Sequence, residues 1–143
     1  MKPDNMKAII GGIVGTIVMT LMMMYMAPLM TGMPMDIAAM LGGMLGGWTM
    51  GMIAHVIMGA IVFPLIYVLI VYHLVGGPPL VRGLVYGAIL WLIAVIVVMP
   101  IAGAGVLMSN VGGMMAVIAA LIGHLVYGGL LGGIAGHGPT RQT

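Results

Sequence analysis

Two histidines lie within apolar stretches of nearly the same design, and their imidazoles are the side chains best suited to cofactor or metal chemistry. Each histidine has a small residue four positions before it and a glycine four positions after it: Gly51, His55 and Gly59 in one stretch, and Ala120, His124 and Gly128 in the other. Four residues make about one helical turn, so the three positions of each stretch share one helix face. On that face the imidazole is the only polar group.

The first hypothesis for this pair is a b-type haem. Such a haem takes two neutral imidazoles from facing helices, and a glycine one turn from a ligand leaves room for the ring. The candidate cofactor-binding residues are His55, His124, Gly51, Gly59 and Gly128. The same two histidines are the candidate metal ligands, although no third ligand is apparent for copper or zinc. The alternative is that each histidine hydrogen-bonds a neighbouring helix while the glycines allow close packing.

Methionines crowd one part of the chain. Eight lie at the end of the first apolar stretch and in the segment after it: Met19, Met22, Met23, Met24, Met26, Met30, Met33 and Met35. Thioethers are soft ligands that favour Cu(I), which makes copper the second cofactor candidate after haem. Methionine is also a flexible apolar filler. We therefore favour a Met-rich face that packs against a larger partner.

Composition identifies the class of protein that carries these residues. Hydrophobic residues make up 63% of the 143 residues and charged residues only 4%, far below the roughly 25% of soluble domains. The sequence therefore predicts an integral membrane protein whose first partner is lipid. The absence of cysteine excludes disulfides, thiol catalysis and Cys-based metal centres. The formal charge of +2 comes from so few residues that it indicates no nucleic-acid partner.

Four stretches approach the roughly 20 apolar residues that a membrane-spanning helix needs. We predict an all-α membrane protein with spans at residues 9–30, 48–74, 80–100 and 111–131. A short helix is expected within residues 31–47, starting near Pro34 or Asp36 and lying in the membrane interface or capping the bundle. Ser109 or Asn110 is the expected N-cap of the fourth span. Pro64 is expected to kink the second.

The basic residues predict how the chain sits in the membrane. Lys2 and Lys7 precede the first span, Arg82 begins the third, and Arg141 follows the fourth. The other two connections carry no Lys or Arg. The positive-inside rule therefore places both termini in the cytoplasm, and we expect a multi-pass protein of a prokaryotic cytoplasmic (inner) membrane.

The chain also has the pattern of an internal duplication. An offset of 72 residues matches the third span to the first at Gly83 and Gly11, Gly87 and Gly15, and Pro100 and Pro28. An offset of 69 matches the fourth span to the second at Ile122 and Ile53, His124 and His55, and Gly128 and Gly59. We predict one transmembrane domain over residues 1–143, made of two parallel two-helix repeats at about 8–75 and 80–136.

Short motifs along the chain point to a known family. They are Met35-Asp36-Ile37, Arg82-Gly83-Leu84, Val98-Met99-Pro100 and the run from Gly123 to Gly128. At these motifs the chain resembles a family of small prokaryotic four-helix integral membrane proteins of unknown function. The resemblance implies the four-span fold and carries over no activity and no functional residues.

Missing chemistry narrows the function further. The only carboxylates, Asp4 and Asp36, fall outside the predicted spans, so no acidic residue can orient a histidine or bind a coupling ion within the membrane. We therefore predict a protein that is not an enzyme: a small integral-membrane subunit or assembly partner of a larger membrane complex, conceivably a redox complex. The alternative is a haem-binding electron-transfer protein that uses His55 and His124. A second alternative is a small-solute transporter or pore.

Overall fold

The computed structural model describes residues 2–137, and this range contains helices and no strand. Four helices of 23 to 27 residues are long and apolar enough to cross a membrane: Asn5–Thr31, Trp48–Leu74, Pro79–Ile101 and Gly113–Ala135. The predicted all-α, four-span architecture of a multi-pass membrane protein is therefore confirmed. The second span has the predicted bounds, whereas the fourth begins and ends later than the predicted 111–131.

Each span except the last is built from several helical segments. The first consists of α1 (Asn5–Leu21), a π-helical segment (Met22–Met26) and α2 (Pro28–Thr31). The second consists of α4 (Trp48–Ile57), a π segment (Met58–Val62), α5 (Phe63–Ile66), a second π segment (Tyr67–Val71) and α6 (Tyr72–Leu74). The third consists of α7 (Pro79–Ile93), a π segment (Ala94–Val98) and α8 (Met99–Ile101), and the fourth is the single helix α9 (Gly113–Ala135).

Prolines explain three of the four π segments. Pro28, Pro64 and Pro100 each follow a π segment by two residues. A proline within a helix has no N–H to donate, and its ring clashes with the carbonyl four residues before it. A π segment relieves this conflict by shifting the hydrogen bonds to a longer register. The expected distortion of the second span at Pro64 is thus confirmed as a π segment that separates α4 from α5.

The register shift frees one carbonyl in each span, and two of the three gain a partner elsewhere in the chain. In a regular α-helix the carbonyl five residues before the proline accepts from the N–H of the residue just before the proline. In the π segments that N–H donates instead to the carbonyl one residue earlier, as Ala27 N does to Met22 O and Phe63 N to Met58 O. Met23 O then accepts from Met35 N at 3.0 Å, which fixes the segment after the first span. Gly59 O accepts from the Tyr127 hydroxyl at 2.5 Å, which ties the second span to α9.

The π segments also recur at the spacing of the proposed duplication. The segments Met22–Met26 and Ala94–Val98 lie 72 residues apart, as do the prolines that follow them. The second and fourth spans differ, because α9 has no π segment. The duplication itself stays a prediction.

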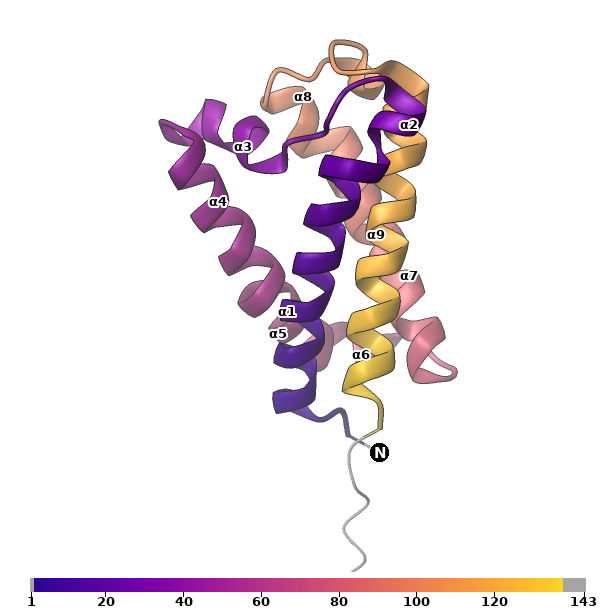
Figure 1. Ribbon diagram of the computed structural model, residues 1–143. Helices are drawn as coiled ribbons and strands as arrows, with labels where there is room; N and C mark the ends of the chain where they lie inside the picture. The colour runs from indigo at the N-terminus through magenta and orange to yellow at the C-terminus, as the bar shows by residue number, and fades with distance from the viewer. Residues whose placement is uncertain (1, 138–143) are drawn as a thin grey trace, which may run out of the picture.

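The unbroken helix α9 lies between α1 and α7 (Figure 1). Its contact with α7 depends on glycine: a Cβ at Gly83 would overlap Gly128 O, and one at Gly87 would overlap His124 O. Its contact with α1 places Gly15 against the Tyr127 side chain. Close backbone approach of this kind is how small residues drive helix association in membranes.

The second span leaves this bundle partway along its length. Near its middle it packs on α1, where Gly59 meets Thr16 and Pro64 meets Gly12. Beyond that crossing α4 diverges from α1 and packs instead on the short helix α3 (Ile37–Leu45) (Figure 1). The contact is tight, because a Cβ at Gly51 would overlap Ala38 O. We call the pair α3 and α4 the arm.

The expected helix within residues 31–47 is confirmed as α3, with Asp36 as its N-cap. The Asp36 carboxylate accepts from Ala39 N at 2.9 Å. The expected cap of the fourth span is wrong, because α9 starts after Gly112, which has no side chain to cap the helix. Asn110 instead donates its amide to Gly103 O at 3.0 Å, which closes the turn before α9.

Candidate functional site

His55 projects from α4 toward the first span and bonds a hydroxyl there. Its Nε2 lies 2.8 Å from Thr20 Oγ1. The Thr20 hydroxyl donates its single proton to Thr16 O at 2.7 Å. Thr20 therefore accepts from the Nε2–H of His55, which leaves the lone pair of the neutral ring on Nδ1.

A small pocket opens beside this hydrogen bond, between the arm and the first span. Its volume is about 70 Å³, and its lining comprises Thr20, Met24, Met35, Asp36, Ile37, Ala38, Trp48, Met52 and His55. Sites for drug-sized ligands occupy roughly 300–1,000 Å³. The pocket as it stands has room for an ion or a few waters but not for a tetrapyrrole.

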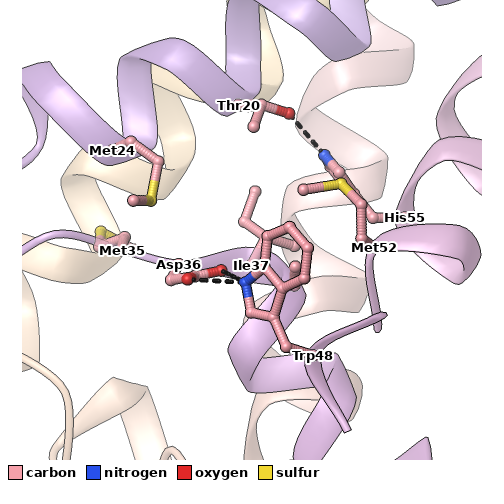
Figure 2. Close-up of a pocket in the computed structure, with 9 residues that line it drawn as sticks. Thr20, Met24, Met35, Asp36, Ile37, Trp48, Met52 and His55 are labelled. Carbon is pink, nitrogen blue, oxygen red and sulfur yellow. Dashed lines mark hydrogen bonds between the residues drawn. The ribbon is translucent and has the colours of Figure 1, made fainter. Parts of the chain in front are cut away.

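Asp36 and Trp48 close one edge of the pocket (Figure 2). The indole Nε1 of Trp48 donates to both carboxylate oxygens of Asp36, at 3.2 and 3.0 Å. The same carboxylate caps α3 through Ala39 N. These bonds join the start of α4 to the start of α3, so the pocket wall depends on the geometry of the arm.

His124 has a different kind of partner. Its Nδ1 lies 2.7 Å from Ala120 O, one turn earlier in the same helix. A carbonyl only accepts, so Nδ1 carries the proton and Nε2 carries the lone pair. Among residues 2–137, no hydrogen bond reaches His124 Nε2.

The structure does not join the two histidines directly. No hydrogen bond links their rings within the described residues. They also differ in which nitrogen is free. A bis-imidazole site through Nε2 would require His55 to give up Thr20.

The glycines of the haem hypothesis are all in contact with neighbouring backbone or side chains. Gly51 packs against Ala38 of α3, Gly59 against Thr16, and Gly128 against Gly83. A flat ring could reach these glycines only if the helices beside them moved. The arrangement is the one expected for close helix packing.

Sequence reasoning missed a cluster at the end of the bundle that holds the N-terminus. Arg82 donates its Nε to Gly77 O at 2.8 Å, bonds Tyr72 O through a second nitrogen, and lies 4.3 Å from the Tyr72 ring centroid. The Tyr72 hydroxyl bonds His137 Nδ1. Arg82, read from the sequence only as a topology signal, thus clamps the connection between the second and third spans. Arg141, the other basic residue after the first span, lies outside the described residues.

Buried tyrosines form a second feature that composition did not reveal. Tyr67, Tyr86 and Tyr127 are at most 3% exposed. Tyr86 donates to Phe63 O at 3.0 Å, whereas the buried Tyr67 hydroxyl has no partner among the described residues. The sequence could not distinguish these buried tyrosines from tyrosines at the lipid interface, because aromatic residues suit both places.

Comparison with known proteins identifies a family without an activity. No curated protein and no solved structure matches the chain. One family model matches residues 3–143, nearly the whole chain. The four apolar spans and this match agree with the resemblance found in the motifs, and the protein belongs to the family of unknown function DUF6789.

Proposed function

We propose that this protein is a non-enzymatic small integral-membrane subunit or assembly partner of a larger membrane complex. The observation that carries the proposal is the arm, which diverges from the other three spans; among residues 2–137 the sides of α3 and α4 that face away from the bundle have no neighbouring helix (Figure 1). A partner's transmembrane helix packed along the arm would cover them.

Small residues on the arm support this role. Exposed apolar side chains such as Ile53 are as stable against lipid as against protein, so they do not distinguish the two neighbours. Glycine and alanine do, because they allow helices to approach closely. Gly43 has open space where a Cβ would stand, and Ala39 one turn earlier is exposed. This pair is the kind of surface that a second helix packs against.

The distribution of charge supports a cytoplasmic location for the end of the bundle that holds the N-terminus. Lys2 and Lys7 lie just before and within the first turn of α1, and Arg82 lies in the first turn of α7. The starts of these two helices lie at the same end of the bundle (Figure 1). Under the positive-inside rule this end faces the cytoplasm and the arm faces the opposite side. The resemblance to small prokaryotic membrane proteins adds the proposed location, a prokaryotic cytoplasmic membrane.

Site-specific photo-crosslinking in native membranes tests the proposal. A photoreactive residue at Ala39 or Ile53 should give one discrete adduct with another membrane protein. The matched control is Ile89, an equally exposed residue on α7. Adducts of the same mass from all three positions, or only lipid adducts at Ala39 and Ile53, would contradict the role of the arm.

The haem-binding alternative keeps one supporting observation. His124 has its Nδ1–H fixed by Ala120 O and its Nε2 free, which is how ligating histidines are usually held. The bonded His55 Nε2 and the packed glycines oppose it. A visible spectrum of protein from its native membrane decides: a Soret band lost in His124→Ala favours haem, and a colourless folded protein excludes it.

A further inference from the structure

We propose that the pocket between the arm and the first span binds a soft monovalent cation of the Cu(I) type. Its proposed ligands are the thioethers of Met24, Met35 and Met52 together with the imidazole of His55. All four line the 70 Å³ pocket, and they come from three separate segments of the chain. This inference does not depend on the presence of a larger complex.

The four side chains lie around one pocket. Figure 2 shows Met24 and Met35 on one side, with Met52 and His55 on the other. Met52 and His55 are three residues apart on α4 and therefore share a helix face. Met35 is held in place by its backbone bond to Met23 O and is 5% exposed. Methionine has three rotatable bonds, so each sulfur can take up several positions around the pocket.

The remaining polar groups of the pocket favour a soft ion over a hard one. Both oxygens of Asp36 already accept from Trp48 Nε1, and one also accepts from Ala39 N. Thr20 is bonded to Thr16 and His55. These bonds take up most of the acceptor capacity of Asp36 and Thr20, so the main remaining ligands are thioether sulfurs and an imidazole nitrogen, which favour Cu(I) over Mg²⁺ or Ca²⁺.

Thr20 has the role of a positioning residue in this site. A ligating histidine usually donates its second N–H to an outer partner, which fixes the tautomer and the ring. Thr20 accepts from His55 Nε2–H, so Nδ1 is the nitrogen with the lone pair. Loss of such a partner typically lowers metal affinity about 10- to 100-fold.

A second methionine-lined pocket provides a control within the same molecule. It lies between the end of the first span and α9, and its lining comprises Met22, Met23, Met26, Ala27, Leu29, Met30, Ala119 and Ile122. Four of these residues are methionines, yet none supplies a ring nitrogen. Methionine content alone would favour this pocket, whereas ligand chemistry favours the one at His55.

The test uses Ag(I), a redox-stable ion with the ligand preferences of Cu(I), titrated into the full chain in detergent and followed by calorimetry. Wild type should bind one equivalent. Met52→Leu should weaken binding about tenfold or more, and Thr20→Val by about tenfold. Met26→Leu in the second pocket should bind like wild type. Methionine to leucine is close to volume-conserving, so the variants should stay folded.

A second readout works without any variant. Bound Ag(I) should protect the partly exposed Met24 and Met52 from peroxide oxidation, as measured by peptide mass spectrometry, and leave Met22, Met26 and Met30 unprotected. The proposal is overturned if wild type binds no Ag(I), if Met52→Leu and Met26→Leu bind equally, or if both groups of methionines are protected alike.

Discussion

His55 and His124 occupy matching positions in two stretches of similar sequence, yet their surroundings differ. The His55 ring crosses to another helix and bonds Thr20, while the His124 ring bonds a carbonyl of its own helix. The helix around His124 continues unbroken, whereas the helix around His55 changes to π geometry at Met58, three residues later. A shared local pattern therefore led to two different environments.

Two single-residue differences account for this divergence. The offset of 72 that relates the first and third spans places Leu92 where the first span has Thr20, so α7 has no hydroxyl at the position that matches Thr20. The offset of 69 places Gly133 where the second span has Pro64. Without a proline, α9 keeps its α register and packs straight between α1 and α7. With one, the second span changes to π geometry, and its first part, α4, diverges to form the arm with α3.

The tight packing of α9 gives the largest predicted effect. Gly128→Leu places a side chain against backbone atoms of Gly83 and Gly87, which cannot yield. We expect the free energy of unfolding, measured by equilibrium unfolding in mixed detergent, to fall by about 3 kcal/mol. Gly133→Leu, where a Cβ meets open space, is the control. Equal stability of the two variants would show that α9 is packed less closely than described.

The bond between α9 and the second span gives a smaller effect. Tyr127→Phe removes the donor to Gly59 O and leaves a carbonyl already freed by Pro64 without a partner. The same unfolding measurement should show a loss of about 1.5 kcal/mol. Tyr25→Phe, at a residue that is 73% exposed, should lose almost nothing. A Tyr127→Phe variant as stable as wild type would mean that water or another group satisfies Gly59 O.

The contrast between the two histidines has a direct spectroscopic test. We expect ¹⁵N NMR of the labelled protein to show His55 protonated on Nε2 and His124 on Nδ1. Thr20→Val should change the His55 signals only, with a loss of about 0.6 kcal/mol in stability, the average for hydrogen bonds between membrane helices. The same tautomer at both residues would contradict the assigned partners.

The exposed bond at the edge of the arm gives the smallest effect. Trp48→Phe removes the donor to Asp36 while keeping an aromatic ring at a residue that is 52% exposed. Global stability should change by no more than about 0.5 kcal/mol. Hydrogen exchange should nevertheless quicken in α3 and α4 and not in α9, because the bond joins the two helices of the arm. An equal increase in the exchange rates of α3, α4 and α9 in the variant would argue against a separate arm.

Much of the fold was predictable because membrane spans depend on local composition. The position of each span followed from its apolar length, and the N-cap at Asp36 followed from residue type. The cap at Ser109 or Asn110 was mispredicted, since Asn110 found a tertiary partner in Gly103. A side chain with two possible partners cannot be assigned from local sequence alone.

The candidate site was harder to predict from the sequence than the fold. His55 could be singled out from the sequence, because a lone imidazole in an apolar span needs a partner. Its partner Thr20, and the meeting of Met24, Met35 and Met52 around it, could not, because they lie on different segments whose rotation and crossing points decide which side chains meet. The glycines could be singled out by their spacing from the histidines, but the residues that contact them could not be predicted.

The amino-acid sequence by itself determined the class of protein, the four spans and the places where prolines break them, since each depends on residues close together in the chain. Only the tertiary structure decided that α9 lies between α1 and α7, that the arm diverges, and which nitrogen of each histidine is free. These features depend on contacts between distant residues, such as Gly59 with Thr16 and Gly128 with Gly83. Helices of similar hydrophobicity gain little from one neighbour over another in lipid, so close packing and a few hydrogen bonds choose the arrangement.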